Sequence, residues 1–501
     1  MACPDWVGRV LGFRFLAMNK EARAFMYDAL ARAPLFISIL FLSTVFLQYA
    51  NLEAGCTKDG WEIEAGQTEE DAIEAEVECN GKAFGFKPSS ILTTLNTGAG
   101  LLLAVILPVA GAIVDHTPHR KSVTLYALYL FWFSNFLQIF TFQTTFFIMV
   151  LVQGLISAQS YLVHQTALFA YLTEVVDDIE RDVSDLNAAA RVWEVGAMFM
   201  FMIPVIIVGR LFFPDDQIGM ARFGQIAACV MSIPGILVVR KDLGERPALS
   251  PVPKGKSVYT QGFTKIKTTL TSLQSTNVNV VKYLTAFVFF EAGNSNLINA
   301  STTLITQQLK ISDPSGILGF ILIVTIPGAA MAPKMKQWLG IKRAVMSVIG
   351  INVLGTLSII FFVNAPSRAS GVWFTGLLYG IGLGMTYPLQ RSLYMYLIPS
   401  GQETEMIGLV QFSGIILSWA PSLAFTVLNE RIGDLRLAMV SILAFHVIGM
   451  LLLTRIDLEQ GLADAAKTAD KRFKVGVGEK TVDEAEVGVE LAAVGPEEQA
   501  L

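Results

Sequence analysis

The 501-residue chain is 53% apolar and only 16% charged, whereas soluble domains carry about 25% charged residues. The apolar residues are grouped in long blocks, such as residues 34–50, and apolar runs of roughly 18 residues or more are candidate membrane helices. The composition therefore excludes an ordinary soluble domain and predicts an all-α, multi-pass protein of the lipid bilayer. The net charge of −5 is uninformative, and no basic patch indicates a nucleic-acid partner.

The apolar runs predict twelve membrane spans. In chain order they cover residues 33–51, 91–114, 122–143, 145–173, 188–213, 218–239, 281–306, 315–334, 344–363, 370–397, 404–428 and 435–455. The expected organisation is an N-terminal segment (1–32), a six-helix bundle (33–239), a basic linker (240–280), a second six-helix bundle (281–455) and a disordered tail (456–501). Two six-span repeats of this kind are the architecture of major facilitator transporters, in which the substrate site lies at mid-membrane between the halves.

The distribution of basic residues predicts how the chain is oriented. Lysine and arginine gather in the N-terminal segment, in the loop HTPHRKS after the second span, in the linker, in residues 334–343 and in the tail. Because basic residues accumulate on the cytosolic side of membrane proteins, we expect both termini and the linker in the cytosol.

The long hydrophilic loop at 52–90 is expected on the opposite, lumenal side. The stretch 51–90 holds ten acidic residues against three lysines, and it contains Cys56 and Cys79. These two cysteines could be free thiols, but in an oxidising lumen or exterior a disulfide between them is favoured.

Four polar residues recur along the fourth span at steps of four, three and four, a spacing that places them on one helical face. They are Gln153, Ser157, Ser160 and His164. Such a stripe can simply hydrogen-bond helices together, but four members in register that end in a histidine favour a water-filled cavity. Gln390 lies on a comparable stripe in the tenth span. We treat these five residues as candidate substrate contacts.

Glu291, in the seventh span, carries the most informative signal. It follows a run of phenylalanines and lies near the expected midplane, where a carboxylate costs several kcal/mol unless it is protonated, paired or hydrated. Acids at this depth are functional candidates, and we expect Glu291 to take part in proton coupling. Gly293 follows, with Asn294 and Asn296 beyond it, a pattern that permits a helix break whose freed backbone groups face substrate. A structural ion pair is the alternative.

Charged residues near the cytosolic ends of spans are candidates for a gate. Arg191 and Glu194 lie one turn apart at the expected start of the fifth span, where they could pair with each other as a gate or a structural bridge. Arg391 lies near the cytosolic end of the tenth span. The stretch GAIVDHTPHRKSV (111–123) resembles the loop signature of major facilitators between spans two and three, and Asp115, Arg120 and Lys121 fall on its charged positions. In that superfamily the loop helps to hold the cytosolic gate.

A second resemblance is more specific. The stretch GIGLGMTYPLQRSLYMYLIPSGQETEMIGL (380–409), followed by SWAP (418–421) and GDLRLAMVSILAFHVIG (433–449), resembles the autophagy-related vacuolar amino-acid effluxer family. That family typically has Ser-Arg-Ser, then a Leu-Ile-Pro turn and an acidic residue. The matching positions here are Arg391, Ser392, Leu397, Ile398, Pro399 and Glu405, with Gln390 in place of the first serine.

The chain departs from that family at two places. Tyr27-Asp28 is followed by ALARAP, without the Asn-Ser of the family's first-span signature. The Asp-Gly of the seventh span is replaced by Glu291-Ala292-Gly293, which displaces the acid by one residue, or about 100° around the helix. The chain is thus similar to a divergent member.

The resemblance implies an alternating-access secondary transporter that moves amino acids out of a vacuole or lysosome-like compartment. Two alternatives stay open: a carrier of another small solute, such as a sugar, phosphate or vitamin, and a transport-inactive receptor or scaffold on the same fold. No cofactor, metal site or paired catalytic groups are expected, so an enzyme is disfavoured. A vacuolar or other endomembrane location is favoured over the plasma membrane.

Overall fold

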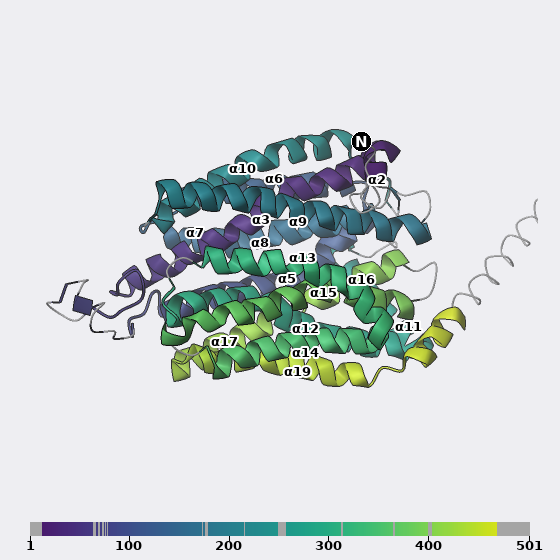
Figure 1. The fold of residues 1–501 in the computed structure, drawn as a ribbon. Coiled ribbons are helices and arrows are strands. Elements are labelled where there is room, and N and C mark those ends of the chain that lie inside the picture. The colour runs from purple at the N-terminus through teal and green to yellow at the C-terminus, as the bar shows by residue number, and fades with distance from the viewer. Residues whose placement is uncertain are drawn as a thin grey trace, which may run out of the picture.

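The computed structural model describes residues 13–467, apart from short gaps at 64–66, 69–70, 73–74, 76, 78, 173, 176–178, 215, 249–256, 312–313, 364–365 and 399–402. Nine segments of this described part are long and apolar enough to cross a membrane, judged by length and composition alone. Three further long helices, α6, α12 and α15, carry more polar residues and lie in the same bundle (Figure 1). The expected all-helical membrane fold is confirmed.

The first half of the chain contributes the helices up to residue 242. They are α2 (Phe13–Met18), α3 (Lys20–Glu53), η1 (Pro88–Ser90), α5 (Ile91–His116), α6 (Arg120–Gln138), α7 (Phe146–Val152), η2 (Gln153–Ser157), α8 (Ala158–Phe169), α9 (Ile179–Phe212) and α10 (Gln217–Asp242). The short η2 is a π-helical turn that joins α7 and α8 into one span.

The second half follows the linker helix α11 (Val258–Thr276). It consists of α12 (Val278–Thr303), η3 (Leu304–Gln308), α13 (Ser315–Leu339), α14 (Ile341–Phe361), η4 (Pro366–Gly371), α15 (Val372–Leu397), α16 (Glu403–Ile415), α17 (Trp419–Ile432), α18 (Leu435–Ala438) and α19 (Val440–Thr454). The span expected at 404–428 is thus divided into α16 and α17.

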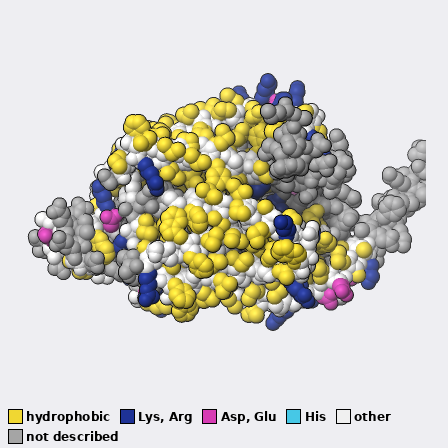
Figure 2. All heavy atoms as spheres, in the orientation of Figure 1, with side chains coloured by type: hydrophobic (Ala, Val, Ile, Leu, Met, Phe, Trp, Pro, Cys, Tyr) yellow, Lys and Arg dark blue, Asp and Glu magenta, His cyan; other side chains and the backbone are white. Residues whose placement is uncertain are grey.

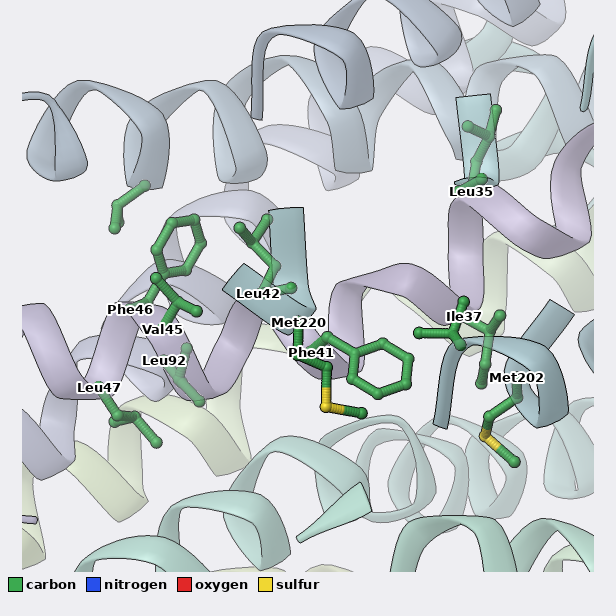
Figure 3. Packing of buried hydrophobic residues seen from close by; sticks show 14 of the residues in the cluster. Leu35, Ile37, Phe41, Leu42, Val45, Phe46, Leu47, Leu92, Met202 and Met220 are labelled. Carbon is green, nitrogen blue, oxygen red and sulfur yellow. The ribbon is translucent and has the colours of Figure 1, made fainter. Parts of the chain in front are cut away.

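Each half has its own apolar core. Two clusters of buried side chains lie wholly between residues 15 and 243, and two others lie wholly between residues 273 and 456. Figure 3 shows one first-half cluster, in which Phe41 of α3 lies beside Met220 of α10, and Ile37 of α3 lies beside Met202 of α9. In Figure 1 the first-half helices α3, α6 and α10 lie above the second-half helices α12, α14 and α19. The two halves are therefore separately packed bodies.

The outer surface is apolar along the middle of the helices. Figure 2 shows hydrophobic side chains over the centre of this face, while lysine, arginine and acidic side chains lie mostly toward its edges and ends. Exposed apolar residues in the middle of helices include Met200 and Ile203 of α9 and Ile323 and Ile326 of α13. A surface of this composition is stable only against lipid.

The first long helix begins earlier than the expected start at residue 33. Helix α3 starts at Lys20, after Asn19, whose side chain caps it by accepting a hydrogen bond from the backbone N–H of Ala22. Part of the segment assigned to the cytosolic N-terminus is therefore inside the bundle, and Asp28 and Arg32 are buried there. Residues 1–12 lie outside the described part of the chain.

The two ends of the bundle are distinguished by their connections. At one end, here called the loop end, residues 54–87 form the long hydrophilic loop, in which Cys56 and Cys79 are joined by a disulfide. The other end, here called the terminal end, carries α2, α11 and the end of α19 (Figure 1). There residues 458–467 form a further helix, although the expected tail was irregular, and residues 468–501 lie outside the described part.

The linker helix α11 contacts both halves. On one side, Lys265 pairs with Asp115 at the end of α5 (Nζ to Oδ2, 2.9 Å), and Gly262 lies against the carbonyl of Pro108 in α5. On the other side, Leu273 is buried in a core cluster of the second half. The linker is thus a packed helix that bridges the halves at the terminal end.

We expect Gly262→Ala to detach α11 from α5. In a helix interior this exchange normally stabilises by about 1 kcal/mol, but here the added methyl carbon would lie 1.9 Å from the Pro108 carbonyl oxygen. Faster proteolytic cleavage of the linker and a lower unfolding temperature are expected. Thr264→Ala, at an exposed position of the same helix, is the control and should leave both unchanged. A stabilised Gly262→Ala protein would contradict the packing described.

Candidate functional site

Asp28 and Arg32 begin a network of buried charges in the first half. They lie four residues apart on α3, so they share a helical face, and the Nε of Arg32 donates to Oδ2 of Asp28 at 2.7 Å. Arg32 lies twelve residues after the first residue of α3, or ~18 Å along the helix. Neither was a candidate in the sequence analysis, because both precede the apolar block.

Glu194 of α9 joins this pair from the neighbouring helix. Its two carboxylate oxygens accept from the two terminal nitrogens of Arg32 at 2.8 and 3.1 Å, a bidentate arrangement. Arg191 also donates to it, from Nη1 to Oε2 at 2.6 Å. The expected pairing of Arg191 with Glu194 therefore occurs, but within a larger network.

His164 of α8 completes the network. Its Nε2 lies 2.6 Å from Oδ1 of Asp28, and its Nδ1 lies 2.8 Å from the backbone carbonyl of Thr124 in α6. The side chain has no exposed surface. We call Asp28, Arg32, His164, Arg191 and Glu194 the buried ion network. It connects three helices, α3, α8 and α9.

The rest of the fourth-span stripe is also buried, contrary to the expected water-filled face. Ser157 receives a hydrogen bond from Asn135 of α6 at 3.5 Å, and Ser160 donates to the carbonyl of Ser157 at 3.0 Å. The Oε1 of Gln153 is buried without a hydrogen-bond partner. The π-helical turn at Gln153–Ser157 adds a residue to this stretch, and the stripe is directed into the first half.

Arg191 extends from this network to the second half. It lies twelve residues, or ~18 Å, after the start of α9, which begins at Ile179 and not at the expected residue 188. The side chain is 40% exposed, and its guanidinium lies over the ring of Tyr387 in α15, 4.6 Å from the centroid. Arg191 thus lies within α9, and its guanidinium group is at the interface between the halves.

Glu291 faces this interface from the second half. It is half-buried and lies thirteen residues, or ~20 Å, after the start of α12, a depth similar to that of Arg32 and Arg191. The amide of Asn294 donates to its Oε2 at 3.3 Å, and the side chain of Gln390, one turn from Tyr387 on α15, also interacts with its carboxyl group. Glu291 of the second half and Arg191 of the first half therefore lie beside neighbouring residues of α15, Gln390 and Tyr387.

Helix α12 is not broken at Gly293, contrary to expectation. The helix is continuous from Val278 to Thr303. The glycine is required instead by the ring of His446 in α19, since a Cβ atom would lie 2.8 Å from that ring. His446 Nε2 lies 2.9 Å from the side chain of Asn294, which also bonds to Asn352 at 3.1 Å. We call Asn294, Asn352 and His446 the amide cluster.

A helix break occurs instead between α16 and α17, and Asn296 stabilises it. The interruption frees backbone carbonyls, and the Asn296 amide donates to that of Ser418 at 2.6 Å. Asn296 also donates to Ala292 at 2.8 Å and accepts from the hydroxyl of Ser422. The side-chain amide of Asn296 therefore bonds to groups of the protein itself in this state.

The remaining gate candidates lie at the terminal end. Asp115 pairs with Lys265 of the linker helix. Arg120, fully buried at the start of α6, donates to Glu174 at 2.7 Å and lies over the ring of Tyr171; Lys121 follows it. The guanidinium of Arg391 lies 5.7 Å from the ring centroid of Phe169 in the other half. Asp115 and Arg391 thus contribute contacts beyond their own halves.

The loop end is closed by hydrogen bonds between the halves, some of which involve the charged groups of Lys87, Lys310 and Glu430. The hydroxyls of Thr93 in α5 and Thr426 in α17 are 2.7 Å apart. The amide of Asn429 donates to the hydroxyls of Ser89 and Ser90 at 2.7 and 2.9 Å. The exposed surface of Arg191 and Glu291 is therefore separated from the loop end by a closed contact between α5 and α17.

The family model described as "Vacuole effluxer Atg22 like" matches residues 187–466, more than half of the chain. The chain belongs to this family. The expected family is thereby confirmed. The match includes Arg191, Glu194 and the whole second half, whereas Asp28, Arg32 and His164 lie outside it. Among the described residues of this vacuole effluxer-like chain, no group of three or more His, Cys, Asp and Glu could hold a metal ion.

Curated relatives are similar over a limited stretch. Autophagy-related protein 22 of Cryptococcus neoformans var. neoformans serotype D, from two strains, is 20% identical over 210 residues. The match covers 39% of this chain and 38% or 37% of the relatives, so it spans well under half of their length.

Solved transporters show the same fold as the effluxer-like chain. A mutant of the nucleoside transporter NupG and the POT family transporter PepTSo each give a TM-score of 0.57 at 11% identity; they cover 87% of this chain and 99% and 97% of their own. The xylose transporter XylE from E. coli, in an inward-open conformation, gives 0.54 at 13% identity over 87% and 99%. The major facilitator fold is confirmed.

We expect Glu194→Gln to destabilise the first half by about 3–5 kcal/mol, because it removes one of the two carboxylates that bond to Arg32 and leaves the buried network with an uncompensated positive charge. Thermal unfolding followed by tryptophan fluorescence measures the effect. The control is Asp115→Asn, which breaks a solvent-facing pair with Lys265 and should cost less than about 1 kcal/mol. Equal losses in the two variants would show that the buried ion network is not a principal stabiliser.

Proposed function

We propose that the chain is an alternating-access secondary transporter that carries amino acids out of a vacuole or lysosome-like compartment into the cytosol. Its family membership and its major facilitator fold support a carrier. One structural observation carries the substrate class. Arg191 of the first half lies over Tyr387 of α15, Glu291 of the second half interacts with Gln390 one turn further along that helix, and both charged side chains keep exposed surface.

Opposite charges on two sides of one region suit a zwitterion. A guanidinium binds a carboxylate through two parallel hydrogen bonds, and a carboxylate accepts hydrogen bonds from an ammonium group. Arg191 would then hold the carboxylate of an amino acid and Glu291 its ammonium group, with Tyr387 and Gln390 beside them. Ionised groups at mid-membrane are costly, so their retention favours a function over packing.

The same observation bears on other solutes. A sugar or another polyol would be satisfied by hydroxyls and amides and gains nothing from a costly pair of opposite charges. A phosphate would be repelled by Glu291. We therefore rank a carrier of a sugar, phosphate or vitamin second. Of the candidates identified in the sequence, we keep Glu291, Asn294 and Gln390 as contacts near the solute, and we propose that Gln153, Ser157, Ser160 and Asn296 position helices.

The closed contact at the loop end supports release toward the terminal end. Basic residues gather at the terminal end, and the disulfide lies at the loop end, so we assign the terminal end to the cytosol and the loop end to the lumen. With α5 and α17 joined at the lumenal side, the solute would leave toward the cytosol once the contacts at the terminal end open. Asp115, Arg120, Lys121, Arg191, Glu194 and Arg391 would rearrange as the halves rock.

The deciding experiment compares amino-acid retention in isolated vacuoles or lysosome-like organelles with and without the protein. Without it, we expect retained amino acids to rise while sugars and phosphate stay constant. A rise in another solute class would replace the substrate. If no solute pool changes and purified protein in liposomes shows no counterflow, a receptor or scaffold on the transporter fold becomes the better description.

We expect Glu291→Gln to fold and reach its membrane normally but to lose pH-dependent flux, since the amide can neither ionise nor take up a proton. Losing a charge-assisted contact of about 1.5–3 kcal/mol should weaken substrate binding roughly 10- to 100-fold. Counterflow in proteoliposomes at several pH values measures both effects. Glu245→Gln, at an exposed site outside the spans, is the control. Unchanged pH-dependent flux in Glu291→Gln would exclude Glu291 from coupling.

A further inference from the structure

The hydrogen-bond partners of His164 determine which of its ring nitrogens carry a proton. Both ring nitrogens lie within hydrogen-bonding distance of an oxygen, and the side chain is fully buried. The carbonyl oxygen of Thr124, 2.8 Å from Nδ1, can only accept, so Nδ1 carries a hydrogen. A neutral ring would then present a bare lone pair at Nε2.

The oxygen that faces Nε2 belongs to an acid. Oδ1 of Asp28 lies 2.6 Å away, and the other oxygen of that carboxylate already accepts from Arg32. Two lone pairs at this distance repel, so the contact requires one more proton between them, on Nε2 or on Oδ1. In either arrangement, Asp28 and His164 together bind one proton that neither the carbonyl of Thr124 nor Arg32 supplies.

The second buried histidine of the described chain provides the contrast. His446 also has both nitrogens near oxygens, the carbonyl of Ile442 at 3.0 Å and the side chain of Asn294 at 2.9 Å. A side-chain amide can turn either its oxygen or its NH₂ group toward the ring. A neutral His446 is satisfied if the amides of Asn294 and Asn352 turn together, which gives up the bond from Asn294 to Glu291. No such turn is open to the carboxylate that faces His164.

We infer that Asp28 and His164 form a proton-binding site in the first half, separate from Glu291 in the second half. Water at the lumenal side would supply the proton, which would be taken up at Nε2 or Oδ1 and released when the contact opens. The part of this site in solute movement rests on the proposed function, but the binding of a proton does not.

The neighbours of the site show what the proton changes. The charged and titratable groups facing it are Arg32 from α3, Tyr161 from α8 and, through Arg32, Glu194 and Arg191 from α9. From α6 the site receives the carbonyl of Thr124, while Arg120, one turn earlier on α6, is directed to Glu174.

The bound proton changes the charge of the buried ion network by one unit. Without it, the two carboxylates and two guanidinium groups cancel, and with it the network carries a net positive charge. Arg191 is the member of this network that reaches the interface between the halves. A proton bound from an acidic compartment therefore favours a carboxylate at Arg191, and its loss at neutral pH weakens that attraction, which couples proton and solute in one direction.

The test measures the pH dependence of stability, with no substrate needed. It is made in the Glu291→Gln background, so that the titration of Glu291 does not contribute. Because the folded contact requires the bound proton, stability is full at low pH and is lost as pH rises past the point of release. Between about pH 5 and about pH 8 we expect the unfolding temperature of this background to fall by several degrees.

Adding His164→Gln should remove at least half of that fall, because a glutamine amide donates to Asp28 at every pH. Adding His446→Gln, the matched buried control, should leave the fall unchanged. If His164→Gln does not fold, Asp28→Asn provides the same test, since an asparagine amide donates to a neutral His164. A fall that persists with His164→Gln or Asp28→Asn, or one that disappears equally with His446→Gln, would overturn the site.

A flux measurement separates this site from the proposed function. Proteoliposomes of the wild-type chain and of His164→Gln are given a radiolabelled mixture of neutral amino acids at acidic and neutral lumenal pH. We expect amino-acid movement from the lumenal side to the cytosolic side to lose its pH dependence in His164→Gln and to retain it in His446→Gln. If the wild-type chain moves none of the mixture, the proposed function fails, while the stability measurement still decides whether Asp28 and His164 bind a proton.

Discussion

Charged groups that are satisfied mainly by one another hold the first half of the molecule in a single arrangement. Arg32 bonds to two carboxylates on different helices, and Glu194 in turn bonds to two guanidinium groups. Ionised groups are expensive away from water, so each contact of this kind is maintained only while its partners stay in place. The relative positions of α3, α8 and α9 follow from this constraint.

The second half solves the same problem with neutral groups. There Asn294, Asn352 and His446 form the polar centre, and Glu291 is the acid beside them. Amides can exchange donor for acceptor by turning, so this centre tolerates different partners at little cost. The two bodies are thus unlike in chemistry although they are alike in fold. A rigid, charged face meets an adaptable one at mid-depth, where Arg191 lies over Tyr387.

The positions of most membrane helices could be predicted, because apolar runs long enough to span a bilayer can be recognised directly in the sequence. The polar groups inside such runs, His164 and Glu291, could be recognised for the same reason. Asp28 and Arg32 could not be recognised in this way. Helix α3 begins thirteen residues before the expected span, and charged residues lower the mean hydropathy of that stretch, so the span was expected to begin after them. The role of Gly293 was also misjudged. A sequence shows that a glycine leaves room but not which neighbour fills it, and here the neighbour is His446, 153 residues away.

The two ends of the molecule are joined by different chemistry, with a consequence for their response to surroundings. At the loop end the described contacts between the halves are hydrogen bonds. Some join hydroxyl and amide groups, such as Thr93 with Thr426, and others run from the ammonium groups of Lys87 and Lys310 to backbone carbonyls. At the terminal end α11 is tied to α5 by Lys265 and Asp115, a solvent-facing ion pair. Dissolved ions weaken exposed ion pairs, whose attraction is screened over about 8 Å at physiological ionic strength, but hardly affect neutral hydrogen bonds. A higher salt concentration in the surrounding fluid should therefore weaken the contact at the terminal end more than the contact at the loop end.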